Sequence, residues 1–336
     1  MQKDLIMLGH GSGGTLSHQL LDELIVPLLS GVGANEQNDA ALLEAGNTRL
    51  AFTTDGYVVD PPIFPGGSIG SLAVHGTVND LAMMGARPLW LSCGLIIEEG
   101  SSRADLSEIL ADLRRAADRA GVQVVTGDTK VVPRGKADRL YITTSGVGVL
   151  EHDLAIHGAN GQVGDRIILS GSAGDHGMAV MAAREGLDAG GLLSDSASLW
   201  ELVELLMEAV GTGLHVLRDP TRGGVATTLK EIARQSGVTL TIDEQAIPVK
   251  PQVKGLCGIL GLDPLYVANE GKLLAFVAPE LAEHALAALR QHPLGQDAAI
   301  IGTVEQGEPG RVRMQTTVGG MRMIEMLAGE QLPRIC

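Results

Sequence analysis

GTVNDLA, residues 76–82, predicts a buried helix at the centre of the fold. It lies in a helix expected from about Ser68 to Gly85, whose other residues are mostly small or apolar, as in a helix buried on all sides. Asn79 and Asp80 interrupt that apolar sequence. Because a buried carboxylate is costly unless it binds a metal ion or another cation, we expect this helix to carry Asp80 into a polar site.

Three further aspartates occur in similar settings around this helix. The strand expected at 50–54 ends on Asp55, the strand at 122–126 leads into Asp128, and Asp39 precedes the first strand. Loops at the ends of strands often carry functional residues. Carboxylates beside glycines suit a hard divalent cation that also binds phosphate oxygens. Ordinary aspartates of turns are the alternative for one or two of the four.

Composition predicts a globular protein with two domains. The chain has 336 residues, of which 45% are apolar, and its helices and strands follow each other in mixed order, which favours an α+β architecture. We expect domains at 1–155 and 156–326, followed by a flexible tail at 327–336. No apolar run has the length of a membrane span, and the first residues do not resemble a signal peptide.

Charge and cysteine content exclude several classes of function. A formal net charge of −15 argues against nonspecific binding to nucleic acid or to anionic membranes. Three well-separated cysteines argue against a disulfide framework or a cysteine zinc site, and they predict a cytoplasmic location. Cys93 and Cys257 lie in apolar runs and are expected to be inert core thiols.

The third cysteine, Cys336, follows Pro333 and Arg334 in LPRIC, residues 332–336. Proline breaks regular structure, and the arginine charge is expected to favour the thiolate, whereas the terminal carboxylate opposes it. This pattern predicts a mobile arm with a nucleophilic tip, which alternates between insertion in a pocket and an outward state. A frayed terminus is the alternative.

Glycine-rich turns offer further binding groups. HGSGGT at 10–15 opens a helix and offers backbone amides to an anion, unless it is only a flexible turn. RDPTRGG at 218–224 combines arginines, an aspartate and glycines, which favours a phosphate or carboxylate site. Glu270 and Lys272 flank a glycine before a strand, where either a site or a solvated hairpin entry is expected. Neither a Walker lysine motif nor a Rossmann fingerprint is present.

Together these motifs resemble the HypE family of hydrogenase maturation factors, the carbamoyl dehydratases. The family is part of the PurM-like superfamily of aminoimidazole ribonucleotide synthetase. The resemblance is carried by HGSGG (10–14), TDGY (54–57), FPGG (64–67), GTVND (76–80), TGDTK (126–130), DPTRGG (219–224), NEGK (269–272) and PRIC (333–336). It implies a two-domain fold whose N-terminal domain forms a strand barrel in a homodimer and whose C-terminal domain is an α/β sandwich.

The resemblance also implies a reaction. The partner HypF places a carbamoyl group on Cys336, and the enzyme uses ATP and Mg²⁺ to dehydrate it to an S-cyanate. A HypC–HypD complex then receives the cyano group, which becomes an iron ligand of NiFe hydrogenase. Phosphoryl transfer makes the carbamoyl oxygen a leaving group, and a base removes the nitrogen proton.

The implied residues fall into three groups. The metal ligands would be Asp39, Asp55, Asp80 and Asp128. The nucleotide site would include Asp55, Asn79, Asp80, Asp128, Thr129, Lys130, Asp219, Arg222 and Lys272. The catalytic residues would be Cys336, Glu270 as the base and His10 as the second candidate base.

Two alternatives stay open on sequence grounds. The first is another ATP-dependent enzyme of the superfamily, such as a selenophosphate synthetase, although no reactive cysteine or lysine follows the glycine-rich N-terminal segment. The second is a non-catalytic maturation scaffold that recruits partners through its acidic surface and tail.

Overall fold

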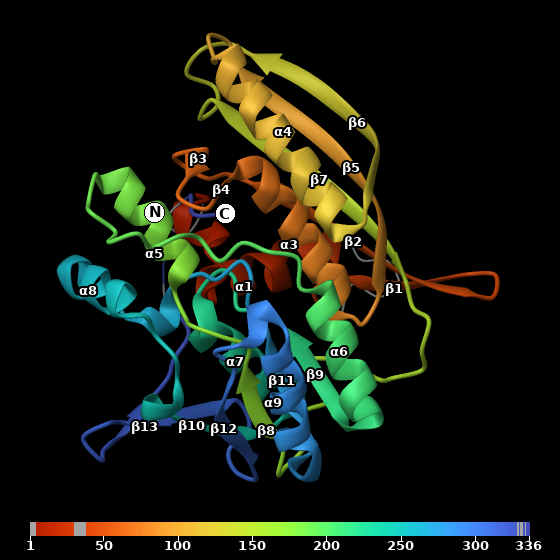
Figure 1. The fold of residues 1–336 in the computed structure, drawn as a ribbon, viewed down its shortest axis with the longest axis vertical. Coiled ribbons are helices and arrows are strands. Elements are labelled where there is room, and N and C mark those ends of the chain that lie inside the picture. Colours follow the sequence, from red (N-terminus) through yellow and green to blue (C-terminus); the bar gives the residue numbers. More distant parts are fainter. Residues whose placement is uncertain (1–4, 30–37, 328, 330–331, 333) are drawn as a thin grey trace.

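The computed structural model describes residues 5–29, 38–327, 329, 332 and 334–336. Its strands form two large sheets, each with its own helices, and Figure 1 shows the five-stranded sheet above the seven-stranded one. This arrangement agrees with the α+β architecture expected from the sequence. The domain boundary at 155/156 stays a prediction, because the hydrophobic clusters combine residues from both halves of the chain.

Among the described residues, helices cover one face of the first sheet. Its strand order is β1 (Ala41–Ala45), β2 (Thr48–Tyr57), β7 (Leu140–Val149), β5 (Arg87–Glu98) and β6 (Gln123–Val132). Helices α3 (Ile69–Met83) and α4 (Arg103–Ala120) lie against it (Figure 1). Gly76 lets α3 approach closely, since a Cβ there would lie 2.3 Å from the Tyr57 hydroxyl. Every residue of α3 except Asp80 is buried, so the predicted buried helix is confirmed.

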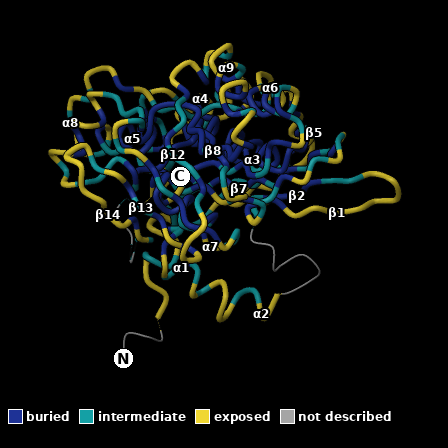
Figure 2. Tube along the Cα trace, turned by 90° about the horizontal axis from the view of Figure 1, so that it is seen from below, coloured by how far each residue is buried: buried dark blue, intermediate teal, exposed yellow. Residues whose placement is uncertain are grey.

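The other face of this sheet is open in the single chain. Phe52 and Trp90 both lie in register with Val147, and their side chains are 41% and 47% exposed. Val124 and Val125 of the edge strand β6 are also exposed. Figure 2 shows the β1 end of the sheet projecting from the body as exposed chain. Such an apolar face on a sheet normally meets a partner surface.

The second sheet is covered on both faces. Its strand order is β14 (Met321–Met323), β13 (Arg311–Gln315), β10 (Thr239–Asp243), β12 (Ala299–Glu305), β8 (Arg166–Leu169), β11 (Leu274–Val277) and β9 (Leu214–Arg218). Ile167 and Leu169 pack with α7 (Gly224–Ser236) on one face. Ile168 points the other way, towards α6 (Trp200–Val210) and α9 (Ala282–Gln291), as strand alternation requires.

Shorter elements connect these layers. They are the β3–β4 hairpin (Ile63–Phe64, Gly67–Ser68), helices α5 (Asp175–Glu185) and α8 (Pro251–Leu260), and 3₁₀ turns at Gly211–Gly213, Glu244–Ala246, Pro264–Tyr266, Pro279–Leu281 and Pro293–Gly295. Among the described residues, no helix combines the length and apolarity that crossing a bilayer requires.

The glycine-rich turn near the N-terminus packs against the start of the tail. It joins the 3₁₀ turn Leu8–Gly11 to α1 (Thr15–Leu20), which continues through a π-helical turn (Leu21–Ile25) into α2 (Val26–Leu29). The Thr15 amide donates to the Leu327 carbonyl over 2.9 Å, and the Gly13 amide donates to Ser17 Oγ over 2.9 Å. These two amides therefore already have partners within the chain.

The segment 194–197, which precedes α6, fastens the two sheets together. Asn79 of α3 donates through Nδ2 to the Ala197 carbonyl over 3.0 Å, and its Oδ1 accepts from the Leu199 amide over 2.8 Å. The same segment passes so close to Gly271 that a Cβ at that glycine would lie 1.8 Å from the Asp195 carbonyl oxygen. Only a glycine fits at this crossing.

Gly271→Ala is therefore expected to destabilise the fold by about 1–3 kcal/mol, the usual cost of overpacking. The control is Gly255→Ala in α8, where a Cβ meets nothing within 4 Å and the better helix former should be neutral or stabilising. Urea unfolding of both variants measures the difference. Equal free energies of unfolding for wild type and Gly271→Ala would contradict this account of the crossing.

Candidate active site

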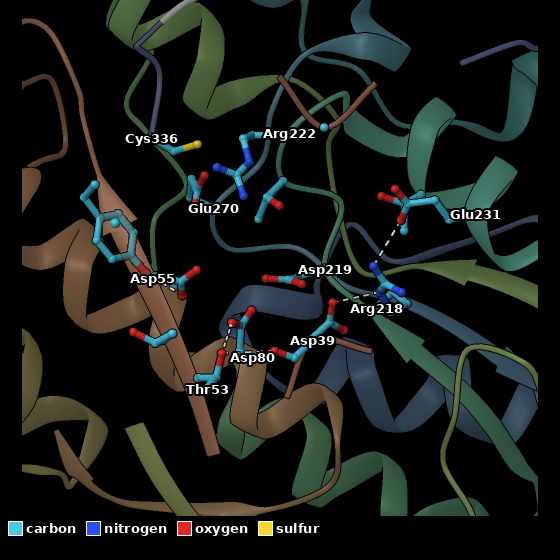
Figure 3. Close-up of a pocket in the computed structure, with 17 residues that line it drawn as sticks. Asp39, Thr53, Asp55, Asp80, Arg218, Asp219, Arg222, Glu231, Glu270 and Cys336 are labelled. Atoms are coloured by element: carbon cyan, nitrogen blue, oxygen red, sulfur yellow. Dashed lines mark hydrogen bonds and ion pairs between the residues drawn. The ribbon is translucent and has the colours of Figure 1, made fainter. Parts of the chain in front are cut away.

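A cavity of about 280 Å³ lies between the end of β2, helix α3, the loop 218–224 and the tail (Figure 3). Most of its lining is polar. The lining residues are Gly13, Asp39, Thr53, Thr54, Asp55, Gly56, Tyr57, Gly76, Asp80, Arg218, Asp219, Thr221, Arg222, Thr228, Glu231, Glu270 and Cys336. The cavity thus brings together residues from both halves of the chain.

Three carboxylates form a cluster at one end. One oxygen each of Asp39, Asp80 and Asp219 lies within 4.8 Å of the other two. Thr53 orients this end, because its hydroxyl donates to Asp80 Oδ2 over 2.7 Å. Asp39 Oδ2 is buried and has no hydrogen-bond partner among the described residues. A hard divalent cation fits this set of oxygens, which agrees with the expectation for Asp39 and Asp80 and adds Asp219.

Crowding makes these carboxyls reluctant to ionise. Burial raises the pKa of Asp39 to about 6, although the guanidinium of Arg218 lies 2.8 Å away and opposes the shift. Burial, followed by the charge of Asp39, raises the pKa of Asp219 to about 8. Burial and the charge of Asp55 also raise the pKa of Asp80 well above its usual range. A bound cation would relieve all three.

The opposite end of the cavity holds the thiol. Figure 3 shows Cys336 beside Arg222 and Glu270, with the aspartates further along the cavity. Burial, followed by the Glu270 carboxyl, raises the pKa of Cys336 to about 12, against the effect of Arg222. The expectation that Arg334 favours the thiolate is wrong, because Arg334 turns away to Asp138 and Asp60.

Glu270 reaches the cavity from the turn before β11. Its backbone amide donates to Asp195 Oδ1 over 3.1 Å, while its Oε1 is buried without a hydrogen-bond partner among the described residues. Burial, followed by the charge of Asp219, raises the pKa of Glu270 well above its usual range. A carboxyl with a raised pKa beside a thiol is suited to proton transfer.

Several predicted site residues lie outside this cavity in the single chain. His10 bonds through Nδ1 to the Met7 backbone. Lys272 is buried against Asp195 at 3.0 Å, and Asn79 bonds to backbone groups of Ala197 and Leu199 at the start of α6. These residues support the site's framework, and their predicted direct roles stay untested.

Asp128, Thr129 and Lys130 are exposed on β6, and the Lys130 ammonium lies 2.6 Å from Asp128. Across the sheet Asp55 falls in register with Gly127, so Asp128 points to the opposite, open face. One chain therefore does not bring Asp128 to the carboxylate cluster.

The structure adds residues that the motif analysis did not assign. Thr53 and Tyr57 lie two residues before and two residues after Asp55 in β2. Because side chains two residues apart in a strand point to the same face, this spacing could have placed them beside Asp55. The Tyr57 hydroxyl donates to Asp55 over 3.1 Å. Arg218 joins Asp39 to Glu231, at 2.8 and 3.0 Å, and only the tertiary structure brings Glu231 there.

Comparison with known proteins identifies the family. Residues 37–150 match the N-terminal domain and residues 162–315 the C-terminal domain of the AIR synthase related proteins. Carbamoyl dehydratase HypE of Bradyrhizobium diazoefficiens is 52% identical over 330 residues, which cover 98% of this chain and 95% of that protein. The chain belongs to the carbamoyl dehydratase HypE family. Membership confirms the resemblance, the enzyme class and the two-domain PurM-like fold predicted from the sequence.

Solved HypE structures agree with this assignment. The structure of the hydrogenase maturation protein HypE in complex with ATP superposes with a TM-score of 0.83 at 50% identity, covering 99% of this chain and 100% of that one. The HypE–HypF complex gives a TM-score of 0.87 at 45% identity, covering 92% of this chain and 99% of the matched chain.

The carboxylate cluster predicts how stability depends on pH. Asp219 is protonated in the fold up to about pH 8 but ionises near pH 4 when unfolded, so its contribution falls as pH rises through this window. In EDTA, the melting temperature of Asp219→Asn should exceed that of wild type only slightly at pH 5 and by on the order of several degrees at pH 8.5. Mg²⁺ should raise the melting temperature of wild type more at pH 8.5 than at pH 5. At either pH it should raise that of Asp219→Asn less than that of wild type.

Scanning calorimetry at both pH values measures this. A wild-type response to Mg²⁺ of the same size at pH 5 and pH 8.5 would contradict the assignment of the cluster as a cation site. Ca²⁺ at equal concentration distinguishes general binding of divalent cations from a preference for Mg²⁺.

Proposed function

We propose that this chain uses ATP and Mg²⁺ to dehydrate a carbamoyl group carried on the Cys336 sulfur, and so makes an S-cyanate for NiFe hydrogenase assembly. The observation that carries the proposal is that one cavity holds a thiol, a carboxyl beside it and a carboxylate cluster suited to a cation. A relative solved with ATP supports the nucleotide, and a relative solved with HypF supports HypF as the carbamoyl donor.

The two ends of the cavity have different tasks in this proposal. Asp39, Asp80 and Asp219, with Asp55 beside them, would hold magnesium, which when bound offsets the negative charge of the phosphates. At the other end Arg222 faces the thiol and the carboxyl of Glu270, where a carbamoyl group on the sulfur would lie. A triphosphate between the two ends would meet the carbamoyl oxygen.

Dehydration then follows in balanced steps. The γ-phosphoryl group passes from ATP to the carbamoyl oxygen, and ADP leaves. The nitrogen loses one proton, which gives an O-phosphorylated imidate. The C–O bond breaks with phosphate as the leaving group while the second nitrogen proton goes to a base, and a C≡N triple bond remains on sulfur. Glu270 is the base.

Loading of the site prepares Glu270 for this role. Its carboxyl is held protonated by burial and by the charge of Asp219. A cation on Asp219 removes part of that repulsion, and the cation and Arg222 both favour the carboxylate form. Binding of the cation would therefore lower the pKa of Glu270 and favour the carboxylate that acts as the base.

The open face of the first sheet supports a homodimer closed by a strand barrel. Phe52 and Trp90 would be buried between two sheets, and β6 would come close to the second copy. This contact is the setting in which Asp128, Thr129 and Lys130 could reach a nucleotide. The HypC–HypD complex as acceptor and a cytoplasmic location stay predictions from the resemblance.

Glu270→Gln tests the catalytic proposal. The variant should accept a carbamoyl group from HypF normally but convert it to the cyanate about 10²–10⁴ times more slowly, because it lacks the base. Mass spectrometry of the peptide that contains Cys336 follows both steps, and phosphate release reports ATP use. Glu201→Gln on the exposed side of α6 is the matched control.

Retained dehydration in folded Glu270→Gln would remove Glu270 as the base. Absence of phosphate release from the carbamoylated wild-type chain would instead favour the scaffold alternative.

Trp90→Glu tests the dimer. A charge on the apolar open face should convert a wild-type dimer into a monomer, as measured by light scattering after size exclusion. The control is Val318→Glu in the β13–β14 turn, where the side chain is already 92% exposed. A monomeric wild type, or a dimeric Trp90→Glu variant, would contradict the barrel.

A further inference from the structure

The described end of the tail is docked beside the residues that follow β2. The Val58 amide donates to the Cys336 carbonyl over 3.1 Å, and the Asp60 amide donates to the Arg334 carbonyl over 3.2 Å. Arg184 of α5 clamps the same place, because its guanidinium donates to the Asp60 carbonyl over 2.7 Å and to the Arg334 carbonyl over 2.5 Å. Pro333, on which the expected mobile arm partly rests, lies outside the described residues.

Ile335 is the buried residue of this docked tail. Its side chain is 4% exposed and packs into the hydrophobic cluster of the first sheet. Its carbonyl oxygen accepts a hydrogen bond from Nε2 of His176, at 2.8 Å. A buried carbonyl next to the reactive residue thus depends on one imidazole for its partner.

His176 is held in one orientation by its surroundings. The residue lies in the first turn of α5, is 0% exposed, and its ring meets Phe64 edge-on with centroids 5.4 Å apart. Nδ1 lies 2.8 Å from Ser194 Oγ, which itself accepts from the Ser196 amide over 3.1 Å. The Ser194 hydroxyl hydrogen is then free for Nδ1, so the hydrogen-bond network assigns the ring proton to Nε2, which donates to Ile335.

The segment that orients His176 also orients Glu270. Asp195 follows Ser194 and accepts the Glu270 amide over 3.1 Å, and the Ala197 amide donates to the Glu270 carbonyl over 3.3 Å. Residues 194–197 therefore help to fix two positions. They fix the Cys336 sulfur through His176 and Ile335, and they fix the Glu270 carboxyl through the Glu270 backbone.

We propose that His176 is a positioning residue that latches the Ile335 carbonyl and so holds the loaded Cys336 sulfur beside the Glu270 carboxyl. The effect on carbamoylated Cys336 rests on the proposed function, whereas the contact between His176 and the tail does not. His176 does not line the cavity and acts through the tail backbone. Loss of the latch should shift the tail outward, which slows dehydration and leaves carbamoyl acceptance intact or faster.

Thiol alkylation tests the latch without any carbamoyl chemistry. In His176→Leu, labelling of Cys336 by N-ethylmaleimide should be on the order of tenfold faster than in wild type, since a typical buried hydrogen bond is lost. His176→Gln, whose Nε2 can still donate, should label near the wild-type rate. Peptide mass mapping separates Cys336 from Cys93 and Cys257, whose rates should not change if the fold is intact.

His75→Leu is the matched control. His75 is also buried and also bonds through Nδ1 to a serine of the same segment, Ser196, at 2.9 Å, but it does not contact the tail.

Ser194→Ala is a milder second variant: it keeps the imidazole but removes the hydroxyl that fixes its tautomer. It should change Cys336 labelling in the same direction as His176→Leu, but less.

A single-turnover experiment then tests the consequence. HypF loads each full-length variant with a carbamoyl group, and ATP with Mg²⁺ starts dehydration. His176→Leu should dehydrate about tenfold more slowly than wild type while accepting the carbamoyl group at least as fast, and His176→Gln should recover most of the rate.

Equal Cys336 labelling in wild type and His176→Leu, or parallel loss of acceptance and dehydration, would overturn the latch. If wild type is loaded but never dehydrates, the proposed function fails, while the labelling result still decides the latch.

Discussion

The site depends on the electrostatic repulsion among carboxyl groups that share one cavity. Asp39, Asp80 and Asp219 come from three separate segments, and burial together with the charges of neighbouring carboxylates raises all three pKa values. A protein keeps such an arrangement only where a cation completes it or where protons neutralise it. The two-sheet architecture exists around this site: helix α3 supplies Asp80, and the loop after β9 supplies Asp219.

A second constraint follows from the proposed function: the thiol would have to lie in the same cavity for dehydration and leave it to receive the carbamoyl group. Backbone hydrogen bonds from Val58 and Asp60 dock the tail, and each such bond is weak in net free energy. Docking through a few hydrogen bonds and one buried isoleucine would let a partner release the tail, as the proposed function requires. The raised pKa of Cys336 fits a thiol that is unreactive while it lies inside the cavity and becomes a better nucleophile outside it.

Motifs whose chemistry is local were predicted well, and placements that depend on strand register were not. The buried helix with Asp80 was recognisable because its polar residues contradict its apolar surroundings. Asp55 and Asp128 have the same sequence setting, a strand beside a glycine, yet they point to opposite faces of one sheet. A shift of one residue in register reverses a side chain, and no local pattern reports it. Arg334 was likewise misjudged, since sequence proximity to Cys336 did not make it the neighbouring charge.

The amino-acid sequence alone determined the family, the α+β class and the list of acidic and glycine-rich turns, because these depend on residue type and spacing. The tertiary structure alone decided which turns share a cavity: it brought in Glu231 and Arg218, left His10 and Lys272 outside, and set Arg222 beside the thiol. The physical reason is that the burial of a side chain and the charges around it depend on its neighbours in space, not on its neighbours in the sequence. Residues far apart in the chain, such as Ser194 and Ile335, become coupled only through a third side chain, His176, that the fold places between them.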